Sequence, residues 1–124
     1  MVNNLKDIAQ GVPELEDMWT LSGIHYHKLF FLLSGRKVVW SMNTPIQLTV
    51  SESVGLRLYG QRYNDTIEDL TEMAKISCSN EIGQIQNGIL IAKQPGFAYI
   101  SASSVKECAD LVLTPILDLI VSPR

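Results

Sequence analysis

Apolar and polar residues alternate in the middle of the chain. Every second residue is apolar over 46–50, and the same pattern returns over 54–58. Because successive side chains of a strand point to opposite faces, each segment predicts a half-buried strand. The short connection Glu52-Ser53 predicts that the two strands are antiparallel neighbours in one hairpin.

A second β-rich region surrounds the dipeptide Asn87-Gly88. Both residues tolerate positive φ, and β-prone runs at 82–86 and 89–93 flank them, which predicts a hairpin with a type I′ turn. Pro95-Gly96 separates this hairpin from another β-prone run at 97–102. The three runs together predict a three-stranded antiparallel meander.

Two helices are predicted on either side of the meander. Asp65-Thr66-Ile67-Glu68 has the pattern of a capping box, and apolar residues continue on one helical stripe as far as Ala74. Ser104-Val105-Lys106-Glu107 is a second capping box, which predicts a long helix that ends near Val121. Pro115 would kink that helix or restart it, because proline removes a backbone donor.

The predicted last helix carries more apolar residues than one core can cover. At about 100° per residue they sweep an arc of about 200°, whereas roughly 100° is enough to face a single core. Leu113, Leu117 and Ile120 lie on the part of the arc that is left over. We therefore expect these three residues to form an interface with a second subunit or a partner.

The first third of the chain is less clearly patterned. Apolar residues from Leu5 to Ala9 predict a short helix capped by Asn3 or Asn4. The segment 13–21 fits either a second helical turn or a strand that ends at Gly23. The segment 24–33 fits a buried strand or a buried helix, and its aromatic residues favour the strand. Residues 37–42 are β-prone.

These elements predict one α+β domain over residues 1–124. Its mainly antiparallel sheet consists of the β-rich middle and the C-terminal meander, packed by two or three helices including the long last one. The order of elements over residues 64–121 resembles roadblock and longin-type scaffolds and the class I chaperones of type III secretion. That resemblance implies a dimeric or partner-bound binder without catalysis, and it assigns no functional residue.

Composition favours a protein partner over other kinds of partner. Charged residues make up 19% of the chain, below the usual share of about 25%, and the mean hydropathy is +0.11. The net charge is −3 and the longest basic run is Arg36-Lys37, so neither nucleic acid nor an anionic membrane is expected to bind. The N-terminal residues lack a secretory signal, which predicts a cytoplasmic protein with unpaired Cys78 and Cys108.

Candidate chemistry is sparse. His25 and His27 stand two apart, as two ligands on one strand face would, but no third ligand has a matching spacing. Cys108 begins the predicted last helix on its apolar face, which favours a buried thiol over a nucleophile. An acidic group at 14–17 fits the first turn of a helix. No metal, cofactor or catalytic residue is therefore predicted.

The functional expectation is a non-enzymatic protein-interaction module that acts as a homodimer or as a subunit of a complex, in the manner of a scaffold or a chaperone. The alternative is a small enzyme or a ligand-binding domain with a site assembled from isolated residues. A metal protein that uses His25 and His27 is a third possibility, which ranks below both.

Overall fold

The computed structural model describes residues 5–15, 19–21, 23–33, 38–40, 45–105 and 111–124. Strands dominate this part of the chain, and its only helix is the short α1 (Leu5–Gln10). The predicted α+β class with a long C-terminal helix and two or three packing helices is therefore wrong. No helix in the described part is long and apolar enough to cross a bilayer.

Most strands belong to two sheets. The six-stranded sheet has the order β4-β3-β6-β10-β9, with β7 also paired to β6, and the four-stranded sheet has the order β5-β12-β11-β8. The bounds in the six-stranded sheet are β3 (Lys28–Leu33), β4 (Val38–Trp40), β6 (Ser53–Gln61), β7 (Ile67–Asp69), β9 (Gly83–Gln86) and β10 (Ile89–Ala92). In the four-stranded sheet they are β5 (Ile46–Thr49), β8 (Lys75–Cys78), β11 (Gly96–Val105) and β12 (Leu111–Ser122). A separate hairpin joins β1 (Trp19–Leu21) to β2 (Ile24–Tyr26).

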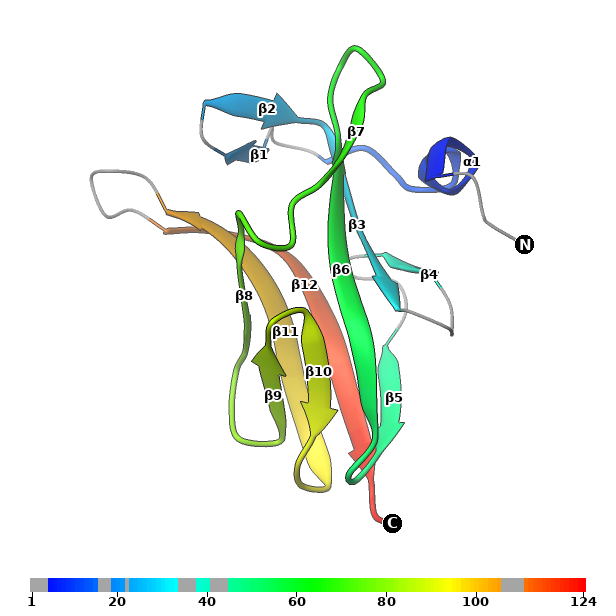
Figure 1. The fold of residues 1–124 in the computed structure, drawn as a ribbon, viewed down its shortest axis with the longest axis vertical. Helices are drawn as coiled ribbons and strands as arrows, with labels where there is room; N and C mark the ends of the chain where they lie inside the picture. The colour runs from blue at the N-terminus through cyan, green and yellow to red at the C-terminus, as the bar shows by residue number, and fades with distance from the viewer. Residues whose placement is uncertain (1–4, 16–18, 22, 34–37, 41–44, 106–110) are drawn as a thin grey trace.

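The core lies between the two sheets. One cluster of buried side chains includes Leu58 and Leu90 from the six-stranded sheet, and Ile100 and Leu119 from the four-stranded sheet. Gly83 marks how closely the sheets approach, because a Cβ there would lie 2.9 Å from Leu119 Cδ2. In Figure 1, β6 and β10 lie in front of β11 and β12. The two sheets thus form a β-sandwich.

The pairing order identifies the kind of sandwich. Taken in chain order as A to G, the strands β3, β6, β8, β9, β10, β11 and β12 give one sheet A-B-E-D and another G-F-C. That is the arrangement of constant-type immunoglobulin-like sandwiches. The cysteine pair that joins strands B and F in antibody domains has no counterpart, because neither β6 nor β11 contains cysteine. This topology defines the architecture and leaves the function open.

Helix α1 lies beside the upper ends of β3 and β6 (Figure 1) and packs against residues on the outer face of the six-stranded sheet. Ala9 and Val12 pack with the buried ring of Phe30, which points away from the main core. Lys28 Nζ donates a hydrogen bond of 2.9 Å to the carbonyl of Ala9. A cation near the last carbonyls of a helix is favourable, because those groups carry partial negative charge. The predicted short helix is confirmed, while its caps Asn3 and Asn4 lie outside the described residues.

The predicted last helix is two strands. Ser104 and Val105 end β11, residues 106–110 lie outside the described part, and β12 begins at Leu111. The register of β11 and β12 shifts between Ser101 and Ser103, so that Thr114 and Pro115 stand opposite Ala102. A bulge of this kind accommodates a residue without an N–H donor. Pro115 therefore marks a β-bulge and not a helix kink.

The predicted helix at 65–74 is a strand and a turn. Asp65 has a φ of 67°, and the Asn64 carboxamide oxygen accepts a hydrogen bond from the Thr66 N–H. These features make a tight turn, and β7 then pairs antiparallel with β6. Only Leu70 to Ala74 retains one helical turn, through the bond from the Ala74 N–H to the Leu70 carbonyl.

Two predicted hairpins have different outcomes. Asn87 and Gly88 have φ of 54° and 76°, and β9 pairs with β10 across them, which confirms the turn. The predicted hairpin around Glu52-Ser53 is wrong, because β5 and β6 belong to different sheets and β5 pairs parallel with β12. The three-strand meander is wrong for the same reason, since β11 lies in the sheet opposite β10.

Candidate functional site

Among the side chains that the structure describes, four large apolar ones are exposed on the outer face of the four-stranded sheet. Phe97 and Tyr99 on β11 are each 49% exposed, and Ile116 and Ile120 on β12 are 44% and 37% exposed. Ala98 on β11 and Leu117 and Leu119 on β12 alternate with them, point inward and are buried, as strand alternation requires. We call these four residues the apolar patch.

The register of β11 and β12 makes the apolar patch continuous. Phe97 lies directly opposite Ile120, and Ser101 lies opposite Ile116. The rings of Phe97 and Tyr99 meet edge to face, with centroids 5.1 Å apart and an interplanar angle of 84°. Aromatic pairs favour this geometry, so the two rings support each other while they remain accessible to a partner.

Small polar residues border the apolar patch on both sides. Gln47 of β5 lies opposite Ile120, and Ser77 of β8 lies opposite Ser101. The Ser79 hydroxyl accepts a hydrogen bond of 2.9 Å from the Tyr99 N–H, and Asn80 donates one to the Phe97 carbonyl. The edge of the apolar patch is therefore held in place by contacts to the backbone of β11.

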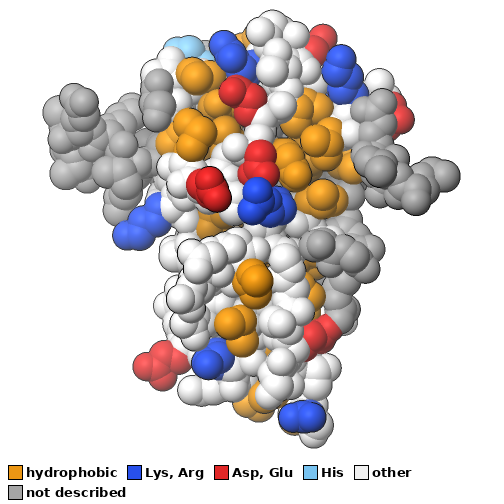
Figure 2. All heavy atoms as spheres, in the orientation of Figure 1, with side chains coloured by type: hydrophobic (Ala, Val, Ile, Leu, Met, Phe, Trp, Pro, Cys, Tyr) orange, Lys and Arg blue, Asp and Glu red, His pale blue; other side chains and the backbone are white. Residues whose placement is uncertain are grey.

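The two faces of the sandwich differ in what covers them. On the six-stranded sheet, α1 covers Phe30 and packs against Tyr59. Figure 2 shows this side, where acidic and basic side chains lie among the hydrophobic ones. Within the described part of the chain, no helix or strand covers the apolar patch on the opposite side.

Of the three residues predicted to form an interface, only one lies in the apolar patch. Ile120 belongs to the apolar patch, but Leu117 is fully buried in the core and faces the other sheet. Leu113 pairs with Ser103, and its side chain lies outside the described part. The helical stripe that joined the three residues does not exist. Sequence reasoning missed Phe97, Tyr99 and Ile116. Strand alternation would have placed Phe97 with Tyr99 over 96–105 and Ile116 with Ile120 over 111–122, and the pairing of the two strands brings these pairs together.

The two histidines do not meet. His25 is exposed and its Nδ1 lies 2.8 Å from the Thr20 hydroxyl, while His27 is buried and binds Glu14 at 2.9 Å. His27 also stacks on the ring of Tyr63 at 4.6 Å. Among the described residues, no three His, Cys, Asp or Glu side chains lie close enough to hold one ion.

A network of hydrogen bonds holds the upper part of the sandwich. Arg57 donates two hydrogen bonds, of 3.1 and 2.8 Å, to Asp69 Oδ2, and Asp69 Oδ1 accepts from the Thr71 hydroxyl at 2.6 Å. Burial opposes ionisation of Asp69, but the bonds from Thr71 and Arg57 outweigh it and lower the pKa of that carboxyl. Burial, together with the bond to Glu68, raises the pKa of Tyr26 to about 12.

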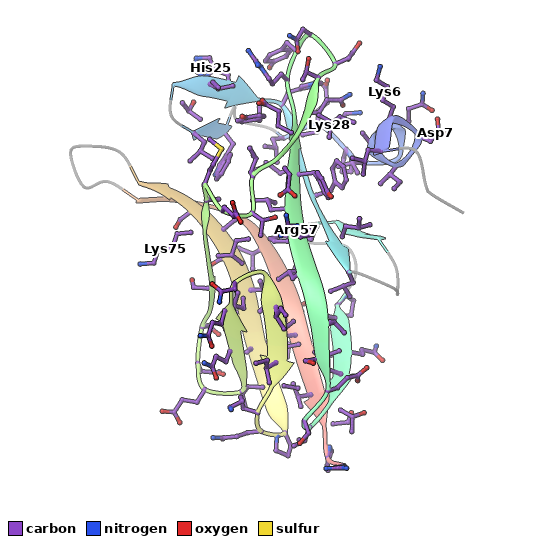
Figure 3. The ribbon with its side chains drawn as sticks, viewed as in Figure 1. Lys6, Asp7, His25, Lys28, Arg57 and Lys75 are labelled. Carbon is purple, nitrogen blue, oxygen red and sulfur yellow. The ribbon has the colours of Figure 1, made fainter. Side chains whose placement is uncertain are left out.

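A cavity of about 500 Å³ lies beside this network and includes Arg57, Glu72 and Lys75 in its lining. Figure 3 shows Lys75 pointing outward from β8, away from Arg57. The two cations therefore do not converge on one point, as an anion site would require.

The two predicted thiols differ in what the structure describes. Cys78 is unpaired and half-buried, whereas Cys108 lies outside the described residues, as do Glu16 and Asp17 of the acidic group.

Comparison with known proteins adds no assignment. Neither the scan against protein-family models nor the search of curated proteins found a match to this sequence.

Proposed function

We propose that this chain is a non-enzymatic protein-interaction domain, an adaptor or scaffold, which docks through the outer face of its four-stranded sheet. The observation that supports the proposal is the apolar patch. Exposed apolar side chains that gather on one face, bordered by polar residues, are typical of protein interaction sites. Scattered single apolar residues would carry no such meaning.

The physical basis is the free energy of burying the apolar patch. Covering a large apolar side chain contributes about 1.5–3 kcal/mol relative to full exposure, and these four are already about half covered. Phe97 and Tyr99 would contribute most, because aromatic residues dominate the energetics of interfaces. A cytoplasmic location belongs to the same proposal and is compatible with the unpaired thiol of Cys78.

Site-specific photocrosslinking tests this proposal. A benzophenone amino acid would replace Tyr99 in one variant and Ile89 in a control variant, because Ile89 is 44% exposed on β10 of the opposite sheet. In the cells that naturally express the chain, we expect a discrete protein adduct at position 99 and none of comparable yield at position 89.

A further substitution makes the crosslinking result specific. Phe97→Ser should remove the adduct at position 99 while circular dichroism and the melting temperature stay close to those of the parent, because Phe97 is half exposed. Equal yields at positions 99 and 89, or an adduct that survives Phe97→Ser, would refute the proposed docking face.

A further inference from the structure

A single carboxylate lies inside the apolar patch. Asp118 stands between Ile116 and Ile120 on the outward side of β12, and it is the direct cross-strand neighbour of Tyr99. Its side chain is exposed, and within the described part of the chain it makes neither a hydrogen bond nor an ion pair. Three of the four apolar side chains of the patch are therefore its immediate neighbours.

Docking of any partner on the apolar patch would remove water from Asp118. An ionised carboxylate that loses water without gaining a partner is strongly unfavourable. Neutral apolar surface alone would thus be a poor partner, and an acidic surface would be worse. A cationic side chain at the centre of the partner's apolar surface would compensate the lost hydration.

Arginine fits this position better than lysine. Its planar guanidinium can donate two parallel hydrogen bonds to a carboxylate, and it is less strongly hydrated than an ammonium group. The same group also stacks on aromatic rings, and Tyr99 lies beside Asp118. One arginine could therefore contact both the carboxylate and an aromatic ring of the patch.

A second copy of the chain fits less well. A two-fold packing centred on the apolar patch would bring the two copies of Asp118 close together, because Asp118 lies near the centre of the patch. Like charges that approach each other at an interface are destabilising. The charge of Asp118 therefore favours a heterologous partner over a homodimer, which the proposed function leaves open.

We infer that the apolar patch and Asp118 together recognise a different protein, whose contact surface presents an arginine flanked by aliphatic or aromatic side chains. The inference rests on the proposed function and adds the chemistry of the partner to it.

The test uses a random linear peptide library displayed on phage, selected on the parent chain and counter-selected on Phe97→Ser. We expect the enriched peptides to contain arginine next to apolar residues. Asp118→Asn should weaken their binding about fivefold, and Asp118→Lys should weaken it further. Glu72→Lys is the matched control, because it makes the same charge change at an exposed position in the β7–β8 turn. It should leave affinity within about twofold at moderate ionic strength, where distant charges are screened.

The outcomes distinguish the two proposals. Peptides that require Phe97 but bind Asp118→Lys as tightly as the parent would overturn the inference and leave the docking face intact. Failure to enrich any peptide that depends on Phe97 would count against the docking face itself. Sedimentation equilibrium covers the remaining alternative: we expect the parent to be monomeric, and a dimer that tightens in Asp118→Asn would overturn the heterologous partner.

Discussion

His27 and Glu14 hold the N-terminal segment against the upper end of the sandwich. His27 Nδ1 lies 2.9 Å from Glu14 Oε1, and the other ring nitrogen lies 3.1 Å from the carbonyl oxygen of Arg62. The Leu15 N–H also donates to the His27 carbonyl at 2.8 Å. Each ring nitrogen of His27 therefore faces an oxygen atom of a residue outside β2 and β3.

The two histidines should differ in their contribution to stability. His27→Ala removes a buried ring, two hydrogen bonds and the stacking on Tyr63, and we expect it to lower the free energy of unfolding by about 1–3 kcal/mol. His25→Ala is the control, because His25 is exposed, and its cost should stay within about 0.5 kcal/mol. Urea unfolding monitored by circular dichroism measures both. Equal costs would contradict the described environment of His27.

The environment of His27 differs from the one that the sequence predicted. The spacing of His25 and His27 predicted two side chains on one strand face. Strand β2 ends at Tyr26, however, and the chain bends at His27 before β3 begins. The ring therefore turns toward Glu14 and Arg62, which are distant in the sequence and could not be paired with it from spacing.

Tyr26 should make stability sensitive to alkaline pH. Its folded-state pKa of about 12 lies above the ordinary value of 10, so its contribution is complete below about pH 10 and is lost as pH rises through 12. Tyr26→Phe removes the bond to Glu68 and should cost about 1 kcal/mol at neutral pH. Between pH 10 and 12, the free energy of unfolding of Tyr26→Phe should fall less than that of the parent. Denaturant unfolding at several pH values measures this. If the free energies of unfolding of parent and variant fell in parallel, Tyr26 would not be the cause of the sensitivity to alkaline pH.

Asp69 should make stability sensitive to acid. Its pKa is lowered in the folded state, so its contribution is present above the unfolded value near 3.9 and is lost as pH falls through the lower folded value. Asp69→Asn replaces the charge-assisted bonds from Arg57 with bonds to a neutral amide. It should lower the free energy of unfolding by about 1–2 kcal/mol at neutral pH. The difference in free energy of unfolding between parent and variant should become smaller below about pH 4. Glu72→Gln, in the adjacent turn, is the control. Its free energy of unfolding should follow the same pH dependence as that of the parent.

The local turn signal at Asn87-Gly88 was predictive, whereas the capping-box patterns and the expected strand pairings were mostly wrong. Asn87-Gly88 fixed its turn because the need for positive φ is a property of the two residues themselves. The capping-box pattern at 65–68 failed because pairing with β6 extended the segment, and tertiary pairing outweighs helix propensity. Apart from the β9–β10 hairpin, the sequence did not show which β-prone runs pair with each other. Sheet membership in this fold is set by contacts between segments far apart in the sequence, such as β5 and β12.

Strand β12 illustrates the same limit and provides the last test. Over 116–121 the burial alternates strictly, whereas the predicted helix placed Leu117 on a flank outside the core of the monomer. Leu117→Ala should therefore cost about 2–5 kcal/mol, because it leaves a cavity between the sheets. Ile120→Thr keeps a β-branched side chain at a partly exposed position and should cost less than about 1 kcal/mol. Thermal and urea unfolding of both variants measure the difference. A helix with Leu117 on its exposed flank would give the reverse order, with Leu117→Ala nearly neutral, and that result would rule out the strand register of β11 and β12 on which the apolar patch depends.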